Sequence, residues 1–197
     1  MRGRPTGHGD IDLMDNRVVI SGVGVVSPVG LDRSTTWASL LDGESGIDQI
    51  TSFDSEGFQT TIAAEVKGFD PEAYVSRKEA RHMDRFVQLA VAATIEALDH
   101  ANVPINGNHS ERLSVMISSG IGGIITLSEQ VGVLQSRGPS RISPFLVPMM
   151  LPDMASGQVS MLVGAKGPNY STVSACSSGA DGIGQAFEAI RRGDADM

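Results

Sequence analysis

Short β-branched runs alternate along this chain with stretches in which apolar residues recur at helical spacing. The first run, residues 17–26 ("RVVISGVGVV"), is uninterrupted, which is typical of a strand buried on both faces in a parallel sheet. Further runs at 60–66, 112–118 and 169–175 each predict a strand. Because strands and helices alternate, the sequence predicts α/β architecture with a mainly parallel sheet.

Apolar residues keep helical spacing over the greatest length at 77–101, and we predict a single long helix there. An earlier helix places Trp37, Leu40 and Leu41 on one face and ends at Gly43. Three more helices are predicted: one from the glycine turn at 119–123 through about Ser136, one at 154–162, and one at 178–192 that ends at Gly193.

Charge and cysteine content limit the classes of protein to which this chain can belong. Its 197 residues carry a formal net charge of -8, so no broad cationic surface exists to bind nucleic acid. The single cysteine cannot form an internal disulfide, and no apolar run is long enough to cross a membrane. We therefore expect a cytoplasmic protein that binds neither nucleic acid nor membrane.

We divide the chain into a disordered lead at residues 1–16 and one domain at 17–197. The lead is polar and glycine-rich and has no apolar periodicity. The last predicted helix is followed by "GDADM", where an α/β unit normally starts its next strand. We therefore expect a domain that is truncated before that strand.

The only cysteine, Cys176, lies in "VSACSSGADGIG", where a predicted strand meets a predicted helix. A tight turn at such a junction lifts a side chain out of the sheet, as in a nucleophile elbow. The helix amino terminus favours a thiolate, and its free N–H groups can stabilise an oxyanion. From position alone, a nucleophile and an inert buried thiol remain equally good interpretations.

Two glycine motifs do not predict nucleotide binding. The segment "GVGVVS" at 22–27 has a serine where the dinucleotide fingerprint needs its third glycine, and it runs into Pro28 instead of a helix. The segment "SGIGG" at 119–123 lacks the Lys-Ser/Thr ending of a phosphate loop. We expect no cofactor and no metal ion, and we interpret these glycines as positions of tight turns and close packing.

Seven segments together resemble the amino-terminal half of a β-ketoacyl-acyl-carrier-protein synthase of the type II elongating class. They are "RVVISGVGVVSPVG", "W..LL.G.SGI", "SRKEARHMDRFVQLA", "SSGIGG", "SPFLVPMM", "GAKGPNYSTVSACSSGADGIGQAF" and "RRGDADM", and they extend over about residues 17–197. The resemblance implies the thiolase-like fold, of which this chain would be the amino-terminal half in a layered αβαβα architecture. It also implies a homodimer at full length.

The resemblance gives Cys176 a chemical role. In the family, the matching cysteine accepts an acyl group from acyl carrier protein, and malonyl carrier protein is then condensed with it by decarboxylation to extend a fatty acid. Two histidines and a lysine complete the family site, and they come from a second half that this sequence lacks. The four histidines of this chain match none of them, and we interpret them as surface residues: His8, His82, His100 and His109.

Two further groups of residues follow from the resemblance. Carrier-protein binding is implied for Arg77, Lys78 and Arg81 at the start of the long helix, with Arg141 as an extension. His82 stands where the family often has another base. An acyl pocket is implied for Ile121, Phe145 and Leu146. For all these positions, an ordinary solvated face or core packing is an alternative.

Two alternative functions remain open from the sequence. One is a catalytically incomplete fragment, either a pseudogene product or a half that binds carrier protein without condensing. The other is the ketosynthase of a polyketide pathway, which "SACSSGA" and "SRKEARHMDRF" favour less than the fatty-acid branch. The related chain-length-factor proteins lack the cysteine, so Cys176 argues against them.

Overall fold

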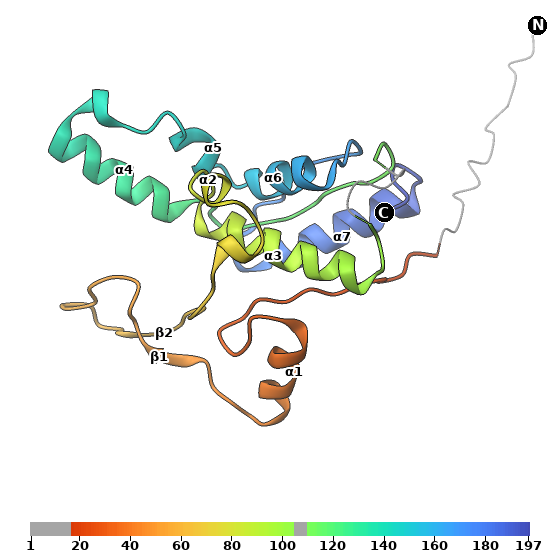
Figure 1. Ribbon diagram of the computed structural model, residues 1–197, viewed down its shortest axis with the longest axis horizontal. Coiled ribbons are helices and arrows are strands. Elements are labelled where there is room, and N and C mark those ends of the chain that lie inside the picture. The colour runs from red at the N-terminus through yellow and green to blue at the C-terminus, as the bar shows by residue number, and fades with distance from the viewer. Residues whose placement is uncertain (1–16, 105–109) are drawn as a thin grey trace, which may run out of the picture.

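A computed structural model describes residues 17–104 and 110–197. Helices dominate the described chain, and a two-stranded arm projects to one side of them (Figure 1). In chain order the elements are α1 (Arg33–Leu41), β1 (Ile47–Gln49), β2 (Ile62–Ala64), η1 (Pro71–Ala73), α2 (Arg77–Ala80), α3 (Arg85–His100), α4 (Ile124–Arg137), η2 (Pro139–Arg141), α5 (Leu146–Met150), α6 (Met154–Val163), η3 (Ala175–Ser177) and α7 (Ser178–Arg191). The predicted lead at 1–16 lies outside the described residues.

The core lies where α3 packs against α6. Val87 and Val91 of α3 and Val159 of α6 are all at most 1% exposed. β-Branched side chains at helical spacing form this contact, and burying each one stabilises the fold by roughly 1.5–3 kcal/mol. Val115, on a segment that crosses this pair, completes the cluster.

Four of the predicted helices form close to their expected positions, namely α1, α4, α6 and α7. Gly43 follows α1 with a φ of 71°, and Gly193 follows α7 with a φ of 77°. The predicted helix at 77–101 is wrong in its continuity, because it is divided into α2 and α3. Ser76 and Glu79 form a capping box on α2, and the Asp84 side chain accepts a hydrogen bond from the Phe86 N–H at the start of α3. Each cap starts a separate helix, so the chain turns between them.

The predicted buried strand at 17–26 is wrong. The segment has no strand partner among the described residues, and Ile20 is 83% exposed. It lies along α3 instead, where Glu96 accepts a hydrogen bond from the Val25 N–H at 2.7 Å. At Gly24 an added Cβ would come within 1.9 Å of the Ala93 carbonyl oxygen, so only glycine allows this close approach.

The predicted strands at 112–118 and 169–175 are reduced to one parallel bridge between Val115 and Asn169. Side chains supply much of the remaining bonding. The Ser156 hydroxyl, fully buried on α6, shares its one hydrogen between the carbonyls of Ile117 and Tyr170, at 3.0 and 3.1 Å, and accepts from the Ile117 N–H at 2.8 Å. A helix serine thus holds together two segments that a sheet ladder would otherwise join.

The predicted mainly parallel sheet is also wrong for the described residues. Their one sheet has two antiparallel strands, β1 and β2, with Ile47 opposite Ala64 and Gln49 opposite Ile62. The strand predicted at 60–66 therefore forms only at its centre, as β2. Within 17–104 and 110–197, no helix is both long and apolar enough to cross a membrane.

Candidate functional site

Cys176 lies at a turn that leads directly into α7. It is the middle residue of η3 and is solvent-exposed, and α7 begins two residues later at Ser178. The preceding residue, Ala175, has a φ of 52°, a left-handed conformation that a residue with a Cβ rarely adopts. Such backbone strain, of order 1–3 kcal/mol, is found at functional turns. The predicted junction is therefore present only on its helix side, since no strand precedes it at 170–174, and the thiol in the turn is exposed.

Hydroxyl groups hold this turn in place. The Ser178 hydroxyl donates to the Ala175 carbonyl at 2.8 Å and accepts from the Ser174 N–H at 2.9 Å. The Ser177 hydroxyl donates to the Ser174 carbonyl, and the Ser174 hydroxyl donates to Asp181. Sequence reasoning missed these three serines as supports of the turn, although their placement on both sides of Cys176 was the signal. None of the described residues accepts a hydrogen bond from the Cys176 N–H, so this donor is available to an oxyanion.

The loop at 119–123 lies beside the elbow. A Cβ at Gly120 would be 3.1 Å from the Ala175 carbonyl oxygen, so the two backbones are nearly in contact. Next to Gly120 is Ile121, which is 65% exposed. Just before this loop, Ser118 packs against Gly182 of α7, while Gly179 and Gly184 face open space. Of the predicted pocket residues, Ile121 is thus the one that the structure brings near Cys176 through a backbone contact.

The segment that carries Phe145 and Leu146 joins the same loop. Phe145 is the N-cap of α5, and Leu146 is its first residue. At the far end of α5, the Met150 carbonyl accepts a hydrogen bond from the Gly123 N–H at 3.0 Å. A Cβ at Gly123 would lie 2.1 Å from the Met149 carbonyl oxygen. Because the two backbones are in contact, α5 and the 119–123 loop form one packed unit.

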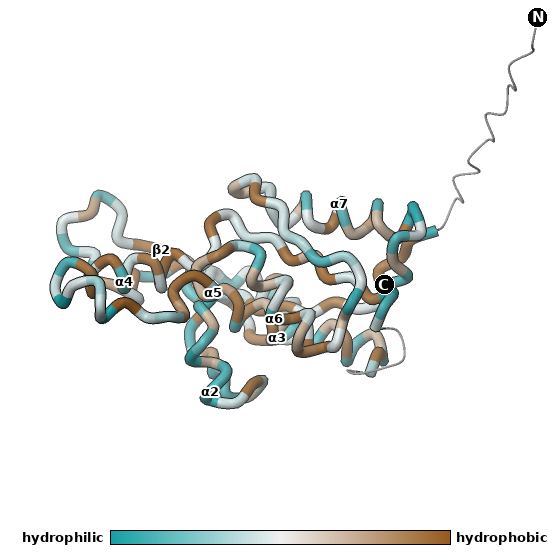
Figure 2. The backbone as a smooth tube through the Cα atoms, turned by 90° about the horizontal axis from the view of Figure 1, so that it is seen from above, coloured by the Kyte–Doolittle hydropathy of each residue, from teal (hydrophilic) through white to brown (hydrophobic). Residues whose placement is uncertain are grey.

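The predicted carrier-binding cations are exposed. Arg77 and Lys78 lie on α2, and Arg81 is its C-cap. Figure 2 shows α2 as a hydrophilic segment that projects from the rest of the chain. Arg77 is 3.7 Å from Glu72 in an exposed ion pair, which stabilises the fold little. Arg141 lies on η2, beyond the end of α4, so the structure does not group it with the other three cations (Figure 1).

Two histidines take part in contacts within the fold. His82, between α2 and α3, stacks on Phe145 with ring centroids 3.9 Å apart. His100, the last residue of α3, accepts a hydrogen bond from the Val23 N–H at 3.0 Å. The prediction of a surface histidine is confirmed for His100, which is exposed although its ring accepts this bond, but it needs correction for His82, which is half-buried against Phe145. The predictions for His8 and His109 fall outside the described residues. Across 17–104 and 110–197, no cluster of three or more His, Cys, Asp or Glu residues could hold a metal ion.

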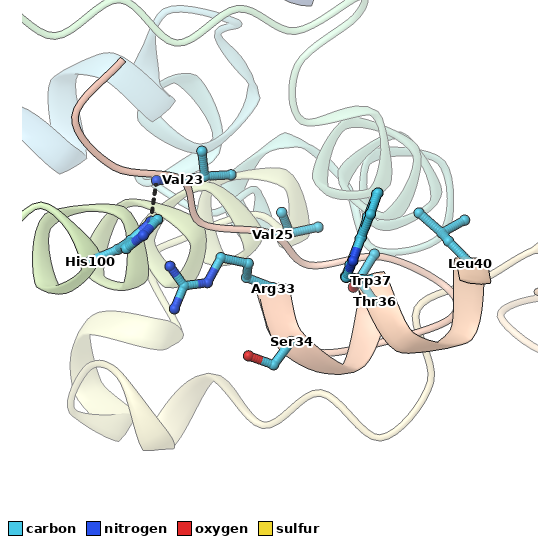
Figure 3. A pocket seen from close by; sticks show the side chains of 8 residues that line it. All are labelled: Val23, Val25, Arg33, Ser34, Thr36, Trp37, Leu40 and His100. Carbon is cyan, nitrogen blue, oxygen red and sulfur yellow. Dashed lines mark hydrogen bonds between the residues drawn. The ribbon is translucent and has the colours of Figure 1, made fainter. Parts of the chain in front are cut away.

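An apolar groove of about 620 Å³ lies between the 17–26 segment and α1 (Figure 3). Val23, Val25, Trp37 and Leu40 supply its apolar lining, and His100 lies at one end. The apolar face predicted for α1 therefore exists but is open, with Trp37 62% exposed. Among the described residues, those predicted for the acyl pocket and for carrier binding do not line this groove.

An exposed cysteine at a strained turn directly before a long helix is an arrangement typical of proteins that use a thiol nucleophile. Comparison with known families identifies the class of protein to which the chain belongs. Residues 15–197 match the family described as "Beta-ketoacyl synthase, N-terminal domain". The chain therefore belongs to the beta-ketoacyl synthase family and has the fold of its N-terminal domain.

Curated relatives and solved structures support this assignment. The chain is 50% identical over 92% of its length to 3-oxoacyl-[acyl-carrier-protein] synthase 2 of Staphylococcus aureus (strain N315) and covers 44% of that protein. It is 42% identical over 92% of its length to the synthase of the same name from Synechocystis, again covering 44%. A solved ishigamide ketosynthase/chain length factor superimposes with a TM-score of 0.80 at 28% identity, over 90% of this chain and 44% of that one. The chain thus spans less than half the length of these relatives.

Proposed function

We propose that this chain carries the acyl-accepting half-reaction of a 3-oxoacyl-acyl-carrier-protein synthase. The Cys176 thiolate attacks the thioester carbonyl of an acyl-acyl carrier protein, forming a tetrahedral oxyanion beside the Cys176 N–H. Collapse of this intermediate expels the carrier's thiolate, which takes up the proton that Cys176 lost. The products are an S-acyl Cys176 and the free carrier thiol. The exposed thiol at the strained Ala175 turn is the observation that carries this proposal.

The complete reaction that we propose is decarboxylative Claisen condensation in fatty-acid elongation. Malonyl carrier protein loses carbon dioxide, and its carbanion attacks the carbonyl of the Cys176 thioester. The C–S bond to Cys176 breaks, the sulfur leaves as a thiolate that takes a proton from solvent, and a 3-oxoacyl carrier protein two carbons longer is released. In the proposed full-length enzyme, a homodimer in the cytoplasm, a second half with the thiolase-like fold supplies the histidines and lysine of this step. One observation favours the fatty-acid branch over a polyketide branch: the chain is 50% identical to the Staphylococcus aureus 3-oxoacyl-[acyl-carrier-protein] synthase 2, against 28% to the ishigamide ketosynthase/chain length factor.

The acylation step can be tested on the chain as it is. The purified protein is incubated with octanoyl-acyl carrier protein, and its intact mass is measured. We expect one octanoyl adduct on the wild-type chain and none on Cys176→Ser. Absence of the adduct on the wild type, or an equal adduct on Cys176→Ser, would contradict the proposed nucleophile. If the carrier protein binds without acylation, the chain is the non-condensing binding half.

A further inference from the structure

A ring stack joins the cationic helix to the predicted acyl-pocket segment. The rings of His82 and Phe145 have centroids 3.9 Å apart and planes inclined by 17°. His82 follows the exposed cation Arg81 directly in the chain, and Phe145 caps α5. The two rings also line one cavity of about 490 Å³ between α2, α5 and α6. The stack is therefore where the proposed docking surface meets the proposed substrate surface.

On its α2 side, the stack is fixed to a helix that has few other attachments. The His82 N–H donates to the Glu79 carbonyl at 2.9 Å, so the imidazole position depends on that of α2. Ala80 is the one buried residue of this helix, and Gln88 of α3 donates to its carbonyl at 3.0 Å. A partner that binds the exposed cations would therefore act on a segment that moves His82 with it.

On its Phe145 side, the stack connects to the elbow through backbone contacts. The Phe145 N–H donates to the Ser143 hydroxyl, and α5 ends at the hydrogen bond from Gly123 to Met150. Gly123 belongs to the loop in which Gly120 lies against Ala175, the residue before Cys176. Glycine leaves no side chain to absorb a displacement at these contacts, so they form a continuous path of packed backbone from α5 to the Cys176 turn.

We propose that the His82–Phe145 stack is a positioning contact that transmits carrier-protein docking on α2 to the turn that holds Cys176. This inference rests on the proposed function, because it takes an acidic acyl carrier protein as the ligand of α2. It assigns His82 a role that a lysine at the same place could not fill, since the ring, and not the charge, makes the contact. A continuous set of contacts does not by itself prove that α2 and the Cys176 turn are energetically coupled. The test is therefore a double-mutant cycle on His82 and Phe145.

The first experiment uses the chain alone. The rate of Cys176 alkylation by iodoacetamide is measured for the wild type, His82→Ala, Phe145→Ala and the double variant. Because each single variant breaks the same contact, we expect each to change the rate by about threefold or more, and the double variant to change it no further.

The matched control is Phe58→Ala, which removes an exposed aromatic side chain on the β1–β2 arm and should leave the rate unchanged. Far-UV circular dichroism establishes that each variant is folded. Unchanged rates in both single variants, or multiplying effects in the double variant, overturn the proposal.

The second experiment adds apo-acyl carrier protein, which lacks the phosphopantetheine arm and so cannot enter the site to block the thiol. We expect docking to change the alkylation rate of the wild-type chain by about threefold. His82→Tyr, which keeps a ring, should retain this response, while His82→Lys, which keeps a charge, should lose it.

If carrier binding is measurable by calorimetry but His82→Lys responds like the wild type, the stack does not transmit docking and the proposal fails. If the carrier does not bind the wild type at all, the docking part of the proposed function fails, and the first experiment still decides whether the stack is coupled to Cys176.

Discussion

The two faces of α3 hold their neighbours by different means. Towards α6, Val87 and Val91 interlock with apolar side chains and are almost completely buried. Towards the 17–26 segment, small residues of α3 pack against glycines. On this face the side chains of Glu96 and His100 accept hydrogen bonds from backbone N–H groups of the segment. The first face resembles the interior of a protein, whereas the second supports a segment that has no strand partner among the described residues. Apolar periodicity therefore predicted the helix, but it did not predict what each face contacts.

The core side should be the more sensitive of the two, and Ser156→Ala tests it most directly. This substitution removes a fully buried hydroxyl and leaves the partly buried Ile117 N–H and the carbonyls of Ile117 and Tyr170 without this partner. We expect the free energy of unfolding to fall by about 3 kcal/mol, measured by guanidinium denaturation. The control is Ser128→Ala on the exposed side of α4, where no more than about 0.5 kcal/mol should be lost. Equal losses in the two variants would mean that Ser156 does not replace a sheet ladder.

On the opposite face of α3, Glu96→Ala should have the next largest effect. Its carboxylate accepts from the Val25 N–H at 2.7 Å and from the Arg33 N–H at 2.8 Å, so it attaches both the 17–26 segment and α1. Because the site is only partly buried, water can replace the carboxylate, and we expect a loss of about 1–2 kcal/mol. Hydrogen exchange should show faster exchange of the Val25 and Arg33 amides. Amide protection in Glu96→Ala equal to that of the wild type would contradict this attachment. The stability of Glu96→Gln should lie between those of the wild type and Glu96→Ala.

In the open groove, Trp37→Ala should change stability least among these substitutions. The indole is 62% exposed, so its removal forfeits little buried area in the chain as described. We expect a change within about 0.5 kcal/mol, against about 2 kcal/mol for Val91→Ala in the core. Thermal unfolding of both variants makes the comparison. A large loss for Trp37→Ala would show that the groove is closed in solution.

The hairpin arm offers a comparison that depends on pH. Hydrogen bonds from the Ser52 and Thr51 hydroxyls and N–H groups lower the pKa of Glu65 from 4.5 to about 2. Because the folded pKa is depressed, these bonds contribute fully above about pH 4.5, and their contribution is lost as the pH falls towards about 2. An NMR titration of the Glu65 carboxyl carbon should give a midpoint near 2. In a Thr51→Val, Ser52→Ala variant the midpoint should rise towards 4.5, and a wild-type midpoint already at 4.5 would contradict the bonding.

Helices and the elbow were more predictable from sequence than strands because their signals are local. The junction at Cys176, the start of α7 near Ser178 and the glycine after Arg192 all depend on residues within a few positions of one another. The division of the helix predicted at 77–101 also had a local signal, the caps at Ser76 and Asp84, but apolar periodicity continued through it and concealed it. Of the candidate site residues, only Cys176 stood in a recognisable local setting.

The amino-acid sequence by itself determined the helical periods, the thiol just before a helix and the family resemblance, because each depends on residue types at fixed spacing. Tertiary structure decided the rest. It determined that the 17–26 segment rests on Glu96 and His100 instead of a strand, that Ser156 joins Ile117 to Tyr170, and that His82 stacks on Phe145. These contacts join residues 14 to 77 positions apart, and such pairings depend on which surfaces meet in space, which no local pattern specifies.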